Sequence, residues 1–462
     1  MDHRRLQSML DFSVSRRRAM RGAAGAAGAV AVGGAIGHGA VASGGSQRSV
    51  ASQAQGAELL FTSTQLVPIE EAEAMRNTIL ADFDRPVEFI PEEPGPFVDR
   101  VTAESQSGQG AVGVLGGLHG DFSAFVEQDL LLELTDLATE LESRGFNPDY
   151  LELARFGTEE VYYIPWMQAM YIMAAHRDAL EFLPEGLTEE TLQTDLTYDL
   201  LATWGTNMAD NAGQLLGFPA AEDGLIHRFL QGYSYPSFTG GLNTTFASAD
   251  AVTMWEWFKQ AWATTNPQAL TYSNMDDPLL SGEVLVAWDH TARLINALTE
   301  TPDDFITFPA PRGPQGLGNM PALAGLAIPR TAPDAEGSRA LIDFLTMPET
   351  QTLTLQEVAF FPVVEVALPT DLNAGTQKEA DAVAATTADP DSLTSLLPVG
   401  LGEQSGAYNK VFRDSLTSIL IDGEDVQTVL DTQKVNLQAV LDTASAPCWT
   451  PDPAGTGTCQ VG

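Results

Sequence analysis

The 462-residue sequence is poor in basic residues: 23 Lys and Arg stand against 62 Asp and Glu, and the lysines are confined to positions 259, 378, 410 and 434. A surface of this charge repels nucleic acid and anionic membranes, so neither is an expected partner. The acidity is typical of an acidic mesophilic protein or of adaptation to high salt. We favour the second, halophilic interpretation, because abundant carboxylates with few lysines keep a protein soluble when salt screens its charges.

The sequence also lacks the motifs of common enzymes. It contains no GxSxG, no HExxH and no Walker lysine loop, and GVLGGLHGD (113–121) lacks the GxGxxG spacing of a dinucleotide site. Beyond residue 42 the four His are widely separated, so we expect no metal site and no cofactor. Acidic residues are too numerous for any catalytic pair to stand out, and an enzyme stays an alternative. No apolar run after the N-terminal segment is long enough to span a membrane.

The N-terminal segment 1–42 differs from the rest of the chain. SRRRAM followed by a weakly hydrophobic Ala/Gly run resembles a twin-arginine (Tat) export signal, and AVA at 40–42 fits a small-x-small cleavage site. An uncleaved anchor is the alternative. Residues 43–56 form a Ser/Gly/Gln-rich linker. We therefore expect an exported, extracellular or cell-surface protein, periplasmic if an outer membrane is present.

Cysteine is nearly absent. Cys448 and Cys459 lie in a Pro/Gly/Thr-rich tail (444–462), and in an oxidising compartment this predicts one local disulfide.

The ordered part of the chain begins as an alternation of strands and helices. Apolar strands are expected in AELLF (57–61), PVEFIPE (86–92) and GAVGVLGGL (110–118), with helices between them. This order predicts an α/β lobe with a largely parallel sheet. Later segments are mainly helical, with strands expected in GEVLVAWDH (282–290), DFITFPAP (304–311) and ALAGLAIPR (322–330).

Aromatic residues lie beside uncharged polar groups in PWMQ (165–168), QGYSYPSFTGG (231–241) and AWDHTARL (287–294). Saccharides are bound by such mixtures, because their C–H faces pack on flat rings while their hydroxyls need oriented polar groups. The helical tryptophans 255, 257 and 262 are interpreted as core. Trp166 and Trp288 end apolar strands beside polar residues, and we expect them to face each other across a groove.

Four segments, in order, resemble the sugar-binding extracellular solute-binding proteins of ABC transporters, the maltose-binding-like family. They are YYIPWMQAMYIMAAHRDAL (162–180), LLSGEVLVAWDH (279–290), LAGLAIPRTAPDAEGSRALIDFLTMPETQ (323–351) and YNKVFRDSLTSILIDGEDVQTVLDTQKVNLQAVL (408–441). The resemblance covers about residues 57–443. The family's usual Asp after the third strand is not obvious here, and His119 and Asp121 stand in its place.

The resemblance implies a two-lobed α/β, periplasmic-binding-protein-like fold with a hinge and a ligand cleft between the lobes. The expected N-lobe comprises 57–166 and 311–350, and the expected C-lobe comprises 167–310 and 351–443. The implied function is to bind a carbohydrate, without chemistry, and to deliver it to a membrane permease that works with a separate ATPase. We expect a monomer. A receptor for a non-sugar solute is the alternative binding function. The expected ligand-binding residues are Ser63, Gln65, His119, Asp121, Trp166, Gln168, Tyr233, Tyr235, Trp288, Asp289, His290 and Tyr408.

Overall fold

The computed structural model describes residues 58–67, 69–401, 404–453, 455 and 457–462. The expected export signal (1–42) and nearly all of the segment that precedes the first strand, including the linker (43–56), lie outside these described residues. Within the described part, none of the helices has both the length and the apolar character needed to cross a membrane.

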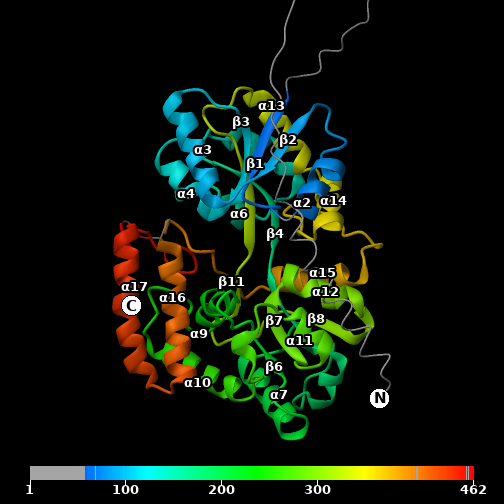
Figure 1. The fold of residues 1–462 in the computed structure, drawn as a ribbon, viewed down its shortest axis with the longest axis vertical. Helices are drawn as coiled ribbons and strands as arrows, with labels where there is room; N and C mark the ends of the chain where they lie inside the picture. The colour runs from blue at the N-terminus through cyan, green and yellow to red at the C-terminus, as the bar shows by residue number, and fades with distance from the viewer. Residues whose placement is uncertain (1–57, 68, 402–403, 454, 456) are drawn as a thin grey trace, which may run out of the picture. The chain divides into compact units, whose positions relative to one another are not determined.

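The first sheet has five strands in the order β2-β1-β3-β10-β4 (Figure 1). β1 (Leu59–Ser63) lies parallel to β2 (Val87–Pro91) and to β3 (Val112–Leu118). β10 (Ala322–Ala327) is antiparallel to both β3 and β4 (Ile164–Ala169). The expected α/β lobe with a largely parallel sheet is confirmed.

Helices cover this sheet, and together they enclose one hydrophobic cluster that includes Phe61, Val114 and Leu326. Gly108, with φ +67°, ends α3 as a left-handed C-cap, a backbone conformation that suits glycine. We call this sheet with its helices the N-lobe. Its helices are α2 (Ile69–Ala74), the π-helix η1 (Met75–Ile79), α3 (Pro94–Ser107), α4 (His119–Glu127), α5 (Thr135–Glu140), the short η2 (Glu142–Arg144), α6 (Pro148–Leu153), α13 (Ala335–Leu345) and α14 (Pro348–Val358).

The second sheet has four strands in the order β6-β7-β5-β8. β5 (Tyr171–His176) pairs antiparallel with β7 (Val286–His290) and with β8 (Phe305–Phe308), and β6 (Leu216–Gly217) is parallel to β7. Two hydrophobic clusters include alternate residues of β5: Met173 belongs to one, and Ile172 and Ala174 belong to the other. Because successive side chains of a strand point to opposite faces, the two clusters lie on the two faces of this sheet.

We call this second sheet and its surroundings the C-lobe. A short parallel pair, β9 (Leu317–Asn319) with β11 (Ser392–Thr394), also belongs to it. Its main helices are η3 (Arg177–Phe182), α7 (Tyr198–Asn211), α8 (Ile226–Phe229), η5 (Leu230–Ser234), α9 (Tyr235–Thr239), α10 (Ala249–Ala263), α11 (Asp276–Ser281), α12 (Thr291–Glu300), α15 (Ala374–Thr387), α16 (Ser405–Leu416), η9 (Thr417–Ile421) and α17 (Val426–Ala444).

The chain passes between the two sheets three times. β4 leads into β5 with Met170 alone between them, the segment after β8 returns to β10, and the segment after α14 leads back to α15. Two expected boundaries are corrected by these connections. The Gly/Pro-rich segment from 311 was assigned to the N-lobe, but its strand β9 pairs with β11 of the C-lobe. The N-lobe was expected to end at 350, yet Val358, the last residue of α14, and Val363 and Val364 beyond the helix all pack in its core.

The tail closes onto the C-lobe. The predicted disulfide between Cys448 and Cys459 is confirmed. Between the two cysteines, the buried carboxylate of Asp452 accepts hydrogen bonds from the backbone nitrogens of Leu242 (3.0 Å), Asn243 (2.7 Å) and Thr244 (3.1 Å). The tail therefore belongs to the folded C-lobe.

Candidate functional site

Polar side chains gather where β1 and β3 end, at the same edge of the N-lobe sheet because the two strands are parallel. The Oδ2 atom of Asp121 accepts hydrogen bonds from the Thr64 hydroxyl (2.7 Å) and from the Leu118 backbone nitrogen (2.9 Å). The Nε2 of Gln65 donates to the Thr64 hydroxyl (3.1 Å), and its backbone nitrogen donates to Ser63 Oγ (2.9 Å). Ser63 is fully buried, whereas Gln65 and Asp121 keep part of their surface exposed. Burial raises the pKa of Asp121, and the two hydrogen bonds oppose that shift.

His119 lies at the first position of α4 and is almost completely buried. Its ring stacks on Phe156, with centroids 4.5 Å apart, and its Nδ1 lies 3.0 Å from the Tyr163 hydroxyl. Burial lowers its pKa to about 4, so the imidazole is neutral at pH 7. These contacts make His119 a packed member of the N-lobe rather than an exposed contact residue.

The expectation that Trp166 and Trp288 face each other across a groove is wrong. Neither indole has exposed surface: Trp166 packs in the N-lobe cluster against Phe61, and Trp288 packs in a C-lobe cluster. The physical reason is that β4 is buried at every position and β7 at all but its last, so ending a strand beside a polar residue does not turn a ring outward. Both indole Nε1 atoms are buried without a hydrogen-bond partner among the described residues.

Gln168, near the end of β4, bonds to the segment that follows α14. Its backbone nitrogen donates to the carbonyl of Phe361 (3.0 Å), and the backbone nitrogen of Phe361 donates back (2.7 Å). The side chain accepts a hydrogen bond from the Tyr150 hydroxyl and donates to the Pro362 carbonyl (3.0 Å). Gln168 therefore joins the first and the third of the connections between the lobes.

Four aromatic rings meet where β5 begins. Tyr171 stacks on Trp288 with centroids 4.9 Å apart and nearly parallel planes, and it meets Tyr233 and His290 edge-on. The Tyr233 hydroxyl donates to the backbone carbonyl of Tyr171 (3.0 Å) and accepts from its nitrogen (3.1 Å). Of these rings, only His290 is more than slightly exposed. We call Tyr171, Tyr233, Trp288 and His290 the aromatic group.

The adjacent residues Asp289 and His290 have different structural roles. Asp289 is fully buried and accepts hydrogen bonds from the backbone nitrogens of Met275 (3.0 Å) and His290 (2.8 Å). Burial raises its pKa to about 7. His290 caps α12, with its Nδ1 accepting from the Ala292 nitrogen (3.2 Å), and its pKa is lowered to about 4 by burial and then by the charge of Arg293. Asp289 thus shapes the turn, and His290 is the one of the pair with exposed surface.

The structure places two of the expected site residues elsewhere in the C-lobe. Tyr235 is buried, donates to the Phe246 carbonyl (3.0 Å) and accepts from Trp255 Nε1 (3.1 Å). Tyr408 is buried and donates to Asn243 Oδ1 (2.8 Å). Their hydroxyls already bond within the protein, so neither offers a ligand contact in this conformation.

Sequence reasoning missed three arginines near the aromatic group: Arg228 of α8, Arg293 of α12 and Arg413 of α16, each half-buried. Arg228 donates to Gln231 Oε1 (2.8 Å), and Gln231 donates to Asn409 Oδ1 (3.0 Å). In the sequence each arginine stands among mixed apolar and polar residues of a helical stretch, in LIHRFLQG, HTARL and KVFRDSL, and no local signal distinguishes it from a surface arginine.

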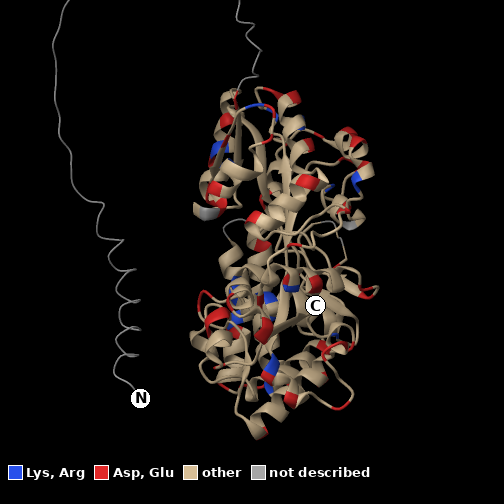
Figure 2. Cartoon of the chain, turned by 90° about the vertical axis from the view of Figure 1, so that its right-hand side faces the viewer, with Lys and Arg blue, Asp and Glu red and all other residues tan. Residues whose placement is uncertain are grey.

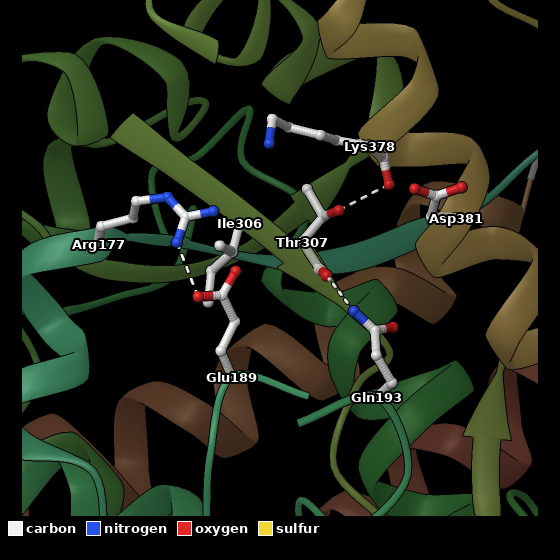
Figure 3. A pocket seen from close by; sticks show the side chains of 7 residues that line it. All are labelled: Arg177, Glu189, Gln193, Ile306, Thr307, Lys378 and Asp381. Atoms are coloured by element: carbon white, nitrogen blue, oxygen red, sulfur yellow. Dashed lines mark hydrogen bonds and ion pairs between the residues drawn. The ribbon is translucent and has the colours of Figure 1, made fainter. Parts of the chain in front are cut away.

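A hollow in the protein surface, lined by none of these residues, lies between β8 and α15 (Figure 3). It holds about 150 Å³, and two pairs of its polar groups are hydrogen-bonded: Arg177 Nη1 with Glu189 Oε2 (2.7 Å), and Gln193 Nε2 with the Thr307 carbonyl (2.7 Å). Gln193 Oε1 is buried without a hydrogen-bond partner among the described residues. None of the expected site residues lines it. Its small volume and its lining give no sign of a solute site.

Comparison with known proteins identifies the family to which the sequence is matched. A family model described as bacterial extracellular solute-binding protein matches residues 70–352. A search of curated proteins found no match.

Solved structures share the fold at low identity. The sugar-binding protein MalE from Xanthomonas citri is 13% identical, with a TM-score of 0.64 over 83% of this chain and 97% of that one. UgpB from Mycobacterium tuberculosis, in complex with glycerophosphocholine, is 19% identical, with a TM-score of 0.63 over 84% and 99%. The GacH receptor of Streptomyces glaucescens GLA.O, solved unliganded and with acarbose, is 14% identical, with a TM-score of 0.61 over 83% and 98%. The two-lobed fold expected from the sequence is confirmed.

Proposed function

Because this chain belongs to the bacterial extracellular solute-binding protein family, we propose that it is the substrate-binding component of an ABC importer for a carbohydrate. Family membership makes it a binding protein and not an enzyme. The fold is shared with MalE from Xanthomonas citri, a sugar-binding protein, and with GacH, which was solved with acarbose. These likenesses support a carbohydrate as the solute.

One structural observation supports a location for the solute-binding site. β1, β3 and β4 point in the same direction in the N-lobe sheet, so the polar ends of β1 and β3 lie at the edge where β4 ends. One residue later the chain enters β5, which begins at the aromatic group of the C-lobe. Ligands of open α/β sheets bind beyond the carboxyl ends of the strands. We therefore assign the solute to the region between Gln65 and Asp121 on one side and Tyr171 and His290 on the other.

Binding would shift the protein toward a closed state, because the solute touches both lobes only there. The three connections between the lobes limit where the backbone can turn. The closed form would then be recognised by a membrane permease driven by a separate ATPase. The chain would act as a monomer, after export directed by the twin-arginine-type segment at 1–42.

A thermal-shift screen tests the proposal. The protein without residues 1–42 is heated with a panel of mono- and oligosaccharides in 2 M KCl, because a solute that binds the folded state raises the melting temperature. Titration calorimetry then gives Kd for each hit. If no carbohydrate raises the melting temperature while amino acids or peptides do, the carbohydrate assignment is wrong.

Two variants place the site. Gln65→Ala and Asp121→Asn each remove one polar partner at the N-lobe edge, and we expect each to weaken solute binding by about 1–2 kcal/mol. Gln427→Ala is the matched control, because its side chain bonds to Asp431 on the exposed face of α17. Equal affinity in all three variants would remove this edge from the site.

A further inference from the structure

Three arginines of the C-lobe have no carboxylate partner among the described residues. Most arginines of the described residues form an ion pair, as expected where acidic residues are in large excess. Arg228, Arg293 and Arg413 have no described carboxylate oxygen within 4.0 Å, and the same holds of Arg76 in the N-lobe. We call Arg228, Arg293 and Arg413 the arginine cluster.

The cluster converges on one short segment, residues 223–228, from three helices. Arg413 Nη2 donates to the Gly224 carbonyl (2.8 Å) and lies 3.1 Å from His227 Nδ1. Arg293 Nη1 donates to the Ser273 carbonyl (2.5 Å) and lies 3.5 Å from the Asp223 carbonyl. Arg228 belongs to the segment itself. Three positive charges are therefore held close together by neutral carbonyl, imidazole and amide groups.

The nearby ionisable groups leave this positive charge largely uncompensated. Burial and the charges of the three arginines lower the pKa of His227 to about 2, so that imidazole is neutral. Two buried carboxylates lie nearby, Asp289 and Asp276. Burial raises the pKa of Asp289 to about 7, and Asp276 accepts a hydrogen bond from Asn296 (3.0 Å) and forms no ion pair with an arginine of the described residues. Glu222 and Asp223 are exposed, where water screens their attraction for the arginines. Like charges held close together repel each other, and a bound anion would reduce this repulsion.

The cluster borders the aromatic group. The charges of Arg228 and Arg293 both lower the pKa of the Tyr171 hydroxyl, against the larger opposite effect of burial, and Arg293 also lowers that of His290. Guanidinium donors remain unused there: Arg413 Nε is buried with no hydrogen-bond acceptor among the described residues. Arg228 uses Nη1 in its one hydrogen bond, which leaves Nε and Nη2 without a described acceptor.

We propose that the arginine cluster binds an anionic group of the solute, so that the ligand is a sugar or polyol that carries a phosphate ester or a carboxylate. The planar fork of a guanidinium donates two parallel hydrogen bonds to either group, and such charge-assisted bonds are about twice as strong as neutral ones. The abundant acidic residues elsewhere repel anions, so an anionic solute would require a local basic site in order to bind. This inference rests on the proposed solute-binding function and narrows its ligand class.

Matched pairs of ligands test it. Each pair contains a neutral compound and its anionic counterpart: glucose with glucose 6-phosphate, glucose with glucuronate, and glycerol with glycerol 3-phosphate. Kd is measured by titration calorimetry with the protein lacking residues 1–42, at one ionic strength set with KCl. We expect at least one anionic member to bind tenfold or more tightly than its neutral counterpart. The phosphate and carboxylate pairs tell which anion is preferred, and inorganic phosphate alone should raise the melting temperature.

Variants tie that preference to the cluster. Arg228→Gln and Arg293→Gln should each lose at least tenfold in affinity for the anionic ligand. Arg76→Gln, the matched control, removes an arginine that also lacks a carboxylate partner but lies in the N-lobe, where it donates to the Phe89 carbonyl (3.0 Å), and it should keep the wild-type Kd. Circular dichroism confirms that each variant is folded.

The outcomes separate the two proposals. If neutral carbohydrates bind as tightly as their anionic counterparts, or more tightly, the carbohydrate function stands and the anion inference is overturned. If the anionic members and inorganic phosphate leave both Kd and melting temperature unaffected, the inference is also overturned. If both cluster variants only lower the melting temperature and bind the anionic ligand with the wild-type Kd, the arginines are structural and the inference fails.

Discussion

We expect Asp452, a residue of the tail, to contribute several kcal/mol to the free energy of unfolding of the C-lobe. Its carboxylate is 3% exposed and accepts three backbone N–H groups, of residues 242–244, and the Thr244 hydroxyl. A hydrogen bond to a charged group contributes about 1.5–3 kcal/mol, but water that enters the vacated site would recover part of that. We therefore expect Asp452→Ala to lower the free energy of unfolding by about 3–5 kcal/mol. Asp452→Asn, which keeps one acceptor oxygen, should cost about half as much.

Urea denaturation measures this loss, followed by circular dichroism and by tryptophan fluorescence. Trp449 lies in the same tail, is buried and packs on Tyr408 with centroids 5.4 Å apart, so it reports release of the tail. Asp431→Ala is the control, because that carboxylate accepts one exposed hydrogen bond, from Gln427. We expect the control to change stability by less than about 0.5 kcal/mol. If Asp452→Ala costs no more than the control, the tail is not anchored as described.

Three further predictions concern stability. Acidic residues lie over both lobes (Figure 2), so the melting temperature should rise steeply between 0.1 M and 2 M KCl as salt screens their repulsion, and a flat series would contradict the halophilic interpretation. Glu379 is fully buried with neither carboxylate oxygen bonded to a described residue, and burial raises its pKa well above 4.5. Above about pH 4.5 the folded state therefore keeps a proton on Glu379 that the unfolded chain loses, so the free energy of unfolding falls as the pH rises. Glu379→Gln should make this pH dependence weaker in urea titrations at pH 5–8. Reducing the Cys448–Cys459 disulfide, which closes a short loop, should lower the free energy of unfolding by about 2–3 kcal/mol, as the paired Ser variants should.

Strands and lobes could be predicted from the sequence because their cause is local. β1, β2 and β3 are short apolar runs bounded by turn-forming or polar residues, and alternation with helices implies parallel pairing. The tail disulfide followed from the presence of two cysteines close together in an exported chain. The lobe boundaries were less accurate, because a Gly/Pro-rich segment predicts a loop without saying which lobe it packs on.

The site was harder to predict, for a physical reason. β4 is buried at all six positions, so no alternation shows which side chains face a solute, and Trp166 packs inside the N-lobe. The arginine cluster comes from positions 228, 293 and 413, and no spacing in the sequence brings these together. Each arginine taken alone has an ordinary surface interpretation. That all three lack a carboxylate partner in the described part of the chain becomes visible only once the chain is folded.

The three passages between the sheets have a practical consequence for dissecting this protein. The N-lobe sheet takes β1 to β4 from one stretch of chain and β10 from another, beyond the whole of β5 to β9. A protease cut at the exposed Pro314–Gln315 would leave one fragment with four strands of this sheet but without β10, which lies between β3 and β4, and the other fragment with β10 as its only strand of this sheet. Such fragments can satisfy their strand edges only by staying together, so we expect the nicked protein to migrate as one species without denaturant. Neither lobe can be produced by truncation; each requires a permuted or spliced gene that joins its separate pieces.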